Sequence, residues 1–327
     1  MSCRCLDEIE KRIKRMEKLE YRPGDKFSTI ATVEPNLQTV HAEKFVQISE
    51  NNIVLEGIIF DRDGMMYCTS TSGHGIFKIN PDTKEVTKIV DCPGVRPAAL
   101  KIHKNGKLYA ACVSNETMGG VFTVDPDGSN LEWIIRGYSV DDICFDDKGG
   151  FYFTHFVGSY RDQQPYGGVY YVNPEHTKLT PFATNMCQPN GVALSTDGSI
   201  MWITEFQAQK LHRFVLETNR ACVPYTFTGW QGPDSCEIDG DDNLYVACAW
   251  QGRFMVFNFY GSPIGQILIP GRENGHNLLT THSMIRPGTQ DVYMTVMDSA
   301  KEDNEGSWIY RAGAFAGYNE NQYQFRK

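Results

Sequence analysis

Short apolar runs that end in a polar turn recur six times along the chain. They are LEGIIFDRDG from Leu55, AALKIHKNG from Ala98, VDDICFDDKGG from Val140, PNGVALSTDG from Pro189, PDSCEIDGDD from Pro233 and the weaker HSMIRPG from His282. Other short segments of alternating apolar and polar residues lie between them, separated by Gly, Asp, Asn or Pro turns. Successive runs start 42 to 49 residues apart. This spacing is typical of four-stranded propeller blades, so the sequence predicts an all-β fold, a six-bladed β-propeller.

The six units account for one domain over residues 31–327. Because a propeller must close its ring, one end of the chain is expected to pair with the other. The segment from His41 to Ile48 is expected to supply the outermost strand of the last blade, which the run from Ser307 to Phe325 completes.

Residues 1–30 follow a different pattern, in which apolar residues recur three or four positions apart with charges between them. These apolar residues are Leu6, Ile9, Ile13, Met16 and Leu19. The spacing predicts an amphipathic N-terminal helix that ends near Pro23 and Gly24. This helix either docks on the propeller or is partly frayed, or it forms a contact between the protomers of a homodimer or a lid over one mouth of the channel.

Composition narrows the class of protein. The chain has 41% hydrophobic and 22% charged residues, a net charge of −9 and a pI near 5.4. No basic surface suited to phosphates is evident, which argues against nucleic acid as a partner. A run of eighteen apolar residues and a signal peptide are both missing, so we expect no membrane insertion and a cytoplasmic location. The ten cysteines are scattered, many within apolar runs, and are expected to be reduced.

Oxygen-bearing side chains recur at one position of the repeats. When the six runs are superimposed, the residues five positions before each turn are Glu56, Ala98, Asp141, Asn190, Asp234 and Thr281. Such residues are common near turns because they satisfy loose backbone groups. Four such side chains at equivalent positions of the repeats, however, would converge on the axis of a propeller. There, three carboxylates repel one another unless a cation holds them. All-oxygen ligands from separate blades favour Ca²⁺.

The same residues carry a resemblance to a known family. Glu56 in LEG, Asp141 and Asp142 in VDD, Asn190 in PNGVALS and Asp234 in GPDS resemble the metal-binding set of the senescence marker protein, gluconolactonase and luciferin-regenerating enzyme family. Segments such as FTGWQGPDSCEIDGDDNLYVA and GSPIGQILIPGRENGH are most similar to its bacterial drug-responsive lactonase branch. The resemblance implies a propeller with one catalytic Ca²⁺ that hydrolyses lactones. Its ligands would be Glu56, Asp141, Asn190, Asp234 and Ser235.

The chain also departs from that branch. The branch has a second, structural calcium, and Thr117, Gly119 and Tyr138 stand where some of its ligands would, but the loop before Asp141 is short and lacks the expected aspartate and threonine. A second ion is therefore not expected. Where relatives commonly read FTD, this chain reads FTH, which places His155 either near the substrate as a proton-transfer group or at the strand end as an ordinary residue. Trp230 and Gln231 also replace the usual residues, so the substrate can differ.

These residues constrain the chemistry. The resemblance implies that Asp234 acts as the acid and base of a metal-dependent carboxylic ester hydrolase, with Asp142 or His282 orienting the water. Two alternatives stay open: a phosphotriesterase or arylesterase in which Asp234 attacks directly, and a non-catalytic small-molecule-binding propeller with a structural calcium. No Gly-x-Ser-x-Gly motif is present to indicate a serine hydrolase.

Overall fold

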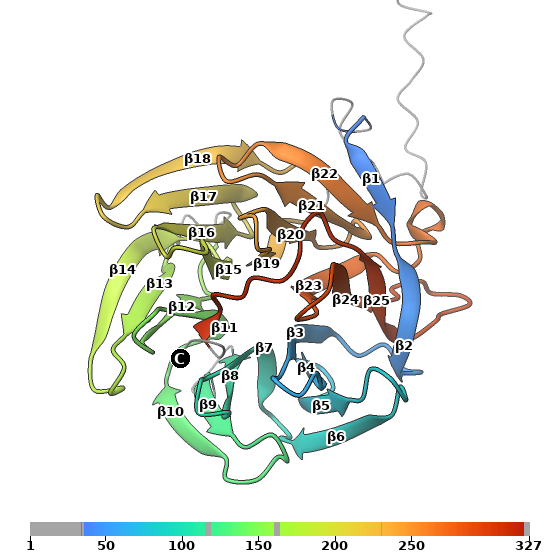
Figure 1. Cartoon of the computed structure of the whole chain (residues 1–327), viewed down its shortest axis with the longest axis horizontal. Helices are drawn as coiled ribbons and strands as arrows, with labels where there is room; N and C mark the ends of the chain where they lie inside the picture. Colours follow the sequence, from blue (N-terminus) through green and yellow to red (C-terminus); the bar gives the residue numbers. More distant parts are fainter. Residues whose placement is uncertain (1–33, 35, 115–118, 160–163, 230, 324–327) are drawn as a thin grey trace, which may run out of the picture.

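Five four-stranded sheets and one five-stranded sheet surround a central axis in the computed structural model (Figure 1), which confirms the predicted propeller. The structure describes residues 34, 36–114, 119–159, 164–229 and 231–323. The predicted N-terminal helix therefore lies outside the described residues. In the part that is described, no helical segment is long and apolar enough to cross a membrane.

The strands of each blade are given from the axis outward. In the first three blades, this order follows the order of the strands along the chain (Figure 1). The strands of blade 1 are β3 (Leu55–Phe60), β4 (Met66–Ser70), β5 (Gly75–Ile79) and β6 (Val86–Asp91). Those of blade 2 are β7 (Arg96–Ile102), β8 (Leu108–Val113), β9 (Gly120–Val124) and β10 (Glu132–Arg136). Those of blade 3 are β11 (Val140–Phe145), β12 (Phe151–His155), β13 (Gly167–Val172) and β14 (Leu179–Met186).

The remaining blades involve both ends of the chain. The strands of blade 4 are β15 (Pro189–Leu194), β16 (Ile200–Glu205), β17 (Lys210–Val215) and β18 (Arg220–Thr226). Those of blade 5 are β19 (Pro233–Ile238), β20 (Leu244–Cys248), β21 (Arg253–Phe257) and β22 (Pro263–Leu268), with β1 (Gln38–His41) added. Those of blade 6 are β23 (Leu279–Ile285), β24 (Asp291–Met297), β25 (Ser307–Gly313) and β2 (Glu43–Ser49). A short 3₁₀ helix, η1 (Arg272–Asn274), precedes blade 6.

Ring closure follows the predicted scheme in part. Strand β2 pairs antiparallel with β25, so the N-terminal segment supplies the outermost strand of blade 6 as expected. The C-terminal strand ends at Gly313, however, and the following residues cross the centre of the molecule (Figure 1). There Tyr323 packs on Phe145, with ring centroids 5.2 Å apart. The predicted run was therefore too long, because the described residues after Gly313, up to Tyr323, lie over the end of the channel instead of completing the blade.

Turn chemistry explains why the inner strands end where they do. In the first repeat, the Asp61 side chain accepts hydrogen bonds from the backbone N–H groups of Asp63 and Met65, both at 2.9 Å. The Asp239 side chain makes the same pair of bonds in the fifth repeat. A side chain that reproduces a backbone turn in this way terminates the strand and fixes the hairpin. The eight described cysteines are all free, as the sequence predicts.

The N-terminal segment is anchored by a buried ion pair at blade 5. Arg253 Nη1 lies 2.8 Å from Glu34 Oε2, and both side chains are almost fully buried. Glu34 also accepts a hydrogen bond from the hydroxyl of Tyr225 in blade 4. Strand β1, which follows Glu34 in the chain, pairs parallel with β22 and adds a fifth strand to blade 5. The sequence pattern does not predict this strand. One carboxylate thus ties the N-terminal segment to two blades.

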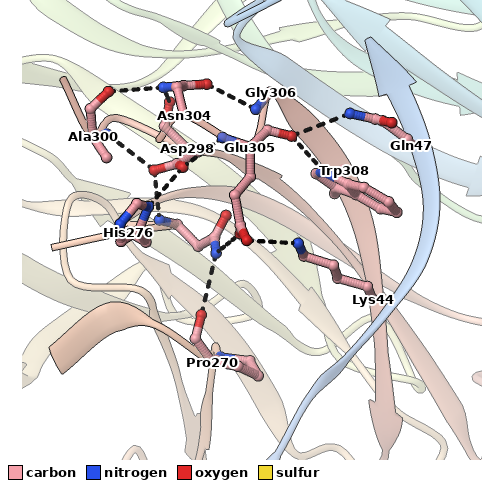
Figure 2. A network of polar contacts seen from close by, with 11 residues as sticks. Lys44, Gln47, Pro270, His276, Asp298, Ala300, Asn304, Glu305, Gly306 and Trp308 are labelled. Carbon is pink, nitrogen blue, oxygen red and sulfur yellow. Dashed lines mark hydrogen bonds and ion pairs between the residues drawn. The ribbon is translucent and has the colours of Figure 1, made fainter. Parts of the chain in front are cut away.

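A second buried carboxylate, Asp298, organises the loop between β24 and β25 (Figure 2). Its two oxygens accept backbone N–H groups from Asn277, Ala300 and Glu305 at 2.8–3.0 Å, and His276 Nδ1 lies 2.9 Å from Oδ2. Burial opposes ionisation of Asp298, but these hydrogen bonds hold its pKa below the ordinary value. The same contact raises the pKa of His276.

Replacing Asp298 by alanine is expected to lower the free energy of unfolding by about 2–4 kcal/mol, since several buried N–H groups lose their acceptor. The loss should depend on pH. The raised pKa of His276 contributes stability that disappears as pH rises through it, whereas the lowered pKa of Asp298 contributes stability that disappears as pH falls through it. Urea midpoints of wild type and variant should therefore differ most near about pH 5–6. An equal difference at all pH values would contradict this assignment.

Candidate active site

All six inner strands carry a β-bulge near their first residues. In each, the register against the second strand of the blade shifts, so that an extra residue is inserted. The residues at the bulges are Glu56 with Gly57, Ala98 with Ala99, Asp141 with Asp142, Asn190 with Gly191, Asp234 with Ser235, and Thr281 with His282. The positions that the repeat comparison equates are therefore structurally equivalent, at one end of the channel.

The three carboxylates of this ring interact strongly. Burial raises the pKa of Glu56 well above its ordinary value, and the charges of Asp234 and Asp141 raise it further. Burial and Asp234 likewise raise the pKa of Asp141. Burial raises the pKa of Asp234 to about 7, although hydrogen bonds from Ser235 and Asn190 oppose the shift. Three acidic groups from blades 1, 3 and 5 thus share one buried, electrostatically unfavourable region.

This donor set fits a hard divalent cation. Glu56 Oε2 is buried and has no hydrogen-bond partner, so this oxygen is available to a cation. The Asn190 side chain adds an amide oxygen, which lies 3.4 Å from the donating hydroxyl of Ser235. Oxygen donors of this kind suit Ca²⁺ better than softer metals. Across the described ranges, no three His, Cys, Asp or Glu side chains are already arranged to hold an ion. The fit therefore rests on donor type and on the unpartnered oxygen of Glu56.

Asp142, the second residue of its bulge, faces a different environment. Its oxygens accept N–H groups from Ile143 at 2.8 Å and from Val192 of blade 4 at 3.1 Å. Burial raises its pKa to about 6, and the ammonium of Lys101 opposes that shift. The carboxylate is thus held between two blades with its orientation fixed by backbone donors.

Lys101 itself forms an ion pair across the channel. Its Nζ lies 2.5 Å from Glu237 Oε2, and the two residues belong to blades 2 and 5, which stand opposite each other in the ring (Figure 1). Beyond this pair lies a cavity of about 300 Å³, lined also by Asn319 and Tyr323 of the C-terminal segment. The ion pair therefore separates the carboxylate ring from the far end of the channel.

His282 is fully buried, and neither ring nitrogen has a hydrogen-bond partner. Burial lowers its pKa well below the ordinary value, and the nearby charge of Lys101 lowers it further. The imidazole is consequently neutral, with one acceptor and one donor available. Its predicted role in orienting water stays a prediction.

His155 makes contacts within its own blade. Its ring packs edge-on against Tyr138, with centroids 5.1 Å apart, and its Nδ1 accepts the N–H of Ser139 at 3.1 Å. Burial lowers the pKa of His155. These contacts favour the interpretation of His155 as a strand-end residue over a ring turned toward the carboxylates. Thr117, which stands at the position of the second calcium of the lactonase branch, lies outside the described residues.

Threonines opposite the bulges were not identified from the sequence. Thr154 Oγ1 accepts the N–H of Asp142 at 3.0 Å and donates to the carbonyl of Asn190 in the next blade at 2.6 Å. Thr204 does the same for Gly191 and Asp234, both at 2.7 Å. Each hydroxyl fixes one bulge and ties it to the next ligand strand. A threonine in the second strand of four repeats, within CTS, FTH, ITE and MTV, was the signal that could have found them.

Glycine is required at two of the bulges. A Cβ atom at Gly57 would lie 2.5 Å from the backbone nitrogen of Leu100, and one at Gly191 would lie 2.5 Å from that of Cys236. Neighbouring inner strands approach too closely there for any side chain. The glycines of LEG and PNG therefore let the strands that carry Glu56 and Asn190 converge on the axis.

An apolar group borders the same end of the channel. Trp250 and Phe206 follow strands of blades 5 and 4. They pack with residues at strand ends of blades 5, 6 and 1, namely Ala249, Leu279, Met297 and Val54. Phe206 also meets Phe156 of blade 3, with ring centroids 6.0 Å apart. The carboxylate ring thus lies beside a partly exposed apolar wall, an arrangement that suits a small organic molecule.

Comparison with known proteins agrees with these features. Residues 118–297 match the SMP-30/Gluconolactonase/LRE-like region. A protein named Lactonase drp35 from Staphylococcus epidermidis is 43% identical over 323 residues, which cover 95% of this chain and 99% of that protein. Its counterpart from Staphylococcus aureus (strain USA300) is 45% identical over 304 residues, 89% of this chain and 93% of that protein. A calcium-binding protein, regucalcin, from Agrobacterium tumefaciens shares the fold, with a TM-score of 0.68 and 16% identity over 86% of this chain and 98% of that one.

Proposed function

Because this chain belongs to the SMP-30/gluconolactonase/LRE-like family, we propose that it is a lactonase that hydrolyses a small lactone to the hydroxy acid. The observation that carries the proposal is the ring of Glu56, Asp141, Asn190 and Asp234 at equivalent bulges, next to an apolar wall. The name of the staphylococcal relatives supports the same activity. Glu56, Asp141, Asn190, Asp234 and Ser235 are the residues that would hold Ca²⁺.

A calcium ion bound there would polarise the lactone carbonyl and stabilise negative charge on its oxygen. The acid and base work falls to Asp234. Burial raises the pKa of Asp234, so its carboxylate is basic enough to accept a proton from the attacking water. The same group then returns a proton to the ring oxygen as the C–O bond breaks.

Other residues act through position. The Thr204 hydroxyl, which donates to the carbonyl of Asp234, fixes the backbone of the proposed base. The neutral ring of His282 can donate to or accept from a water molecule without adding charge. The apolar wall around Trp250 excludes water from one side of the mouth, which strengthens the interactions with the developing charge.

Removal of the metal is the direct test of calcium dependence. Wild type should hydrolyse at least one member of a panel of aldonolactones, alkyl γ-lactones and dihydrocoumarin, and should lose that activity in excess chelator. Added Ca²⁺ should restore activity and raise the melting temperature, since a ligand that binds only the folded state stabilises it. Full activity after exhaustive chelation would contradict the proposal. Preferential cleavage of paraoxon would favour the phosphotriesterase or arylesterase alternative, and calcium binding without any hydrolysis would favour the non-catalytic propeller.

A further inference from the structure

Arg96 lies at the mouth of the channel, in the blade opposite the one that supplies Trp250. Arg96 is the first residue of β7 and is exposed, two positions before Ala98 in the ring of bulges. Strand β7 packs between β3, which carries Glu56, and β11, which carries Asp141. Blade 2 contributes no polar side chain to the ring, because its position is occupied by Ala98. This strand, which supplies none of the proposed ligands, therefore contributes a cation at its open end.

The charge of Arg96 reaches the site. It lowers the pKa of both Glu56 and Asp141, against the stronger effects of burial and of the other carboxylates. Within the described ranges the guanidinium forms no ion pair, so its donors are available to a ligand. Blade 5, which supplies Trp250, stands opposite blade 2 (Figure 1). A bound molecule can thus place an apolar end on one side and an anionic end on the other.

We propose that Arg96 recognises the carboxylate that ring opening creates. This inference rests on the proposed lactonase function. In that reaction the oxygen of water bonds to the carbonyl carbon, the bond to the ring oxygen breaks, that oxygen takes a proton, and a second proton is released to solvent. A neutral lactone becomes a hydroxy acid anion. A guanidinium matches a carboxylate with two parallel hydrogen bonds, so it favours the product and the charge that develops toward it over the neutral substrate.

The test compares an acid with its uncharged analogue. The probes are 3-(2-hydroxyphenyl)propanoate, the product of dihydrocoumarin, and the corresponding amide, each titrated by calorimetry into the calcium-loaded protein. Wild type is expected to bind the acid roughly 10- to 100-fold more tightly than the amide, the range that charged hydrogen bonds provide. Arg96→Gln should lower this preference roughly 10-fold and leave only the part that the calcium ion provides, and Arg96→Lys should lower it less because the charge remains but the planar fork is lost.

The matched control is Arg220→Gln, which removes the same charge from the outermost strand of blade 4 and should keep the full preference. Arg96 is exposed, so its variants are expected to fold, and equal melting temperatures would verify this. An undiminished preference for the acid in Arg96→Gln would overturn the proposal, as would failure of wild type to bind the acid. Failure of wild type to hydrolyse any lactone would instead overturn the proposed function, because the calorimetric comparison needs no turnover.

Discussion

Asp234→Asn is expected to lower kcat for lactone hydrolysis by roughly 10²- to 10⁴-fold, the usual contribution of a positioned acid or base. The amide keeps the shape of the side chain and one oxygen, but it cannot accept the proton from water. Its backbone remains fixed by Thr204, and its buried position places it within the carboxylate ring. Steady-state kinetics at saturating Ca²⁺ measure the loss, and calorimetry with Ca²⁺ shows whether the ion still binds.

The matched comparison is Asn190→Ala, which removes a neutral oxygen donor from the same ring. Its activity should fall because Ca²⁺ binds more weakly, and high Ca²⁺ should restore part of it. Proton transfer lost in Asp234→Asn cannot be restored in this way. Near-native rates for Asp234→Asn would show that Asp234 is not the base, and full rescue by Ca²⁺ would reduce its role to that of a ligand.

Much of this arrangement was predictable because each blade repeats the same local chemistry. An apolar strand, a bulge and an Asp or Asn turn recur at similar spacing, so the repeat comparison alone equated Glu56, Asp141, Asn190 and Asp234. The closing strand followed from the need of a ring to have no free edge. Strand β1 and the path of the C-terminal segment across the channel were not predicted. Neither belongs to the repeat, and each depends on contacts between distant residues.

The orientation of His155 shows how alternation along a strand refines such a prediction. Successive side chains of a strand point to opposite faces. The hydroxyl of Thr154 reaches the carbonyl of Asn190 in blade 4, so the next residue turns to the other face, toward Tyr138 and Ser139. Once the structure shows the direction of Thr154, alternation places the His155 side chain on the face away from blade 4. The bulges of the inner strands are the exception to this alternation, which is why neighbours such as Asp141 and Asp142 both lie near the channel.

Glu34→Ala is expected to lower the free energy of unfolding by about 3–5 kcal/mol, the usual cost of leaving one partner of a buried ion pair alone. Without Glu34, the guanidinium of Arg253 would retain its bond from Nε to Gln266 at 2.8 Å, but Nη1 would lose its acceptor and Nη2 already has none. Arg272 adds to the cost. Burial lowers the pKa of Arg272 and the charge of Arg253 lowers it further, so the two cations repel each other. The Tyr225 hydroxyl would also lose its acceptor, which loosens the contact with blade 4.

A double-mutant cycle separates the ion pair from simple packing. Arg253→Met fills similar volume without charge, so Glu34→Ala combined with Arg253→Met should cost clearly less than the sum of the two single changes. Urea unfolding of the four proteins gives the coupling free energy directly. Additive effects would mean that the pair contributes little and that strand β1 holds the N-terminal segment by itself. A large coupling would identify Glu34 as the residue that fastens this segment to the ring, because its carboxylate is the acceptor that the two blades share.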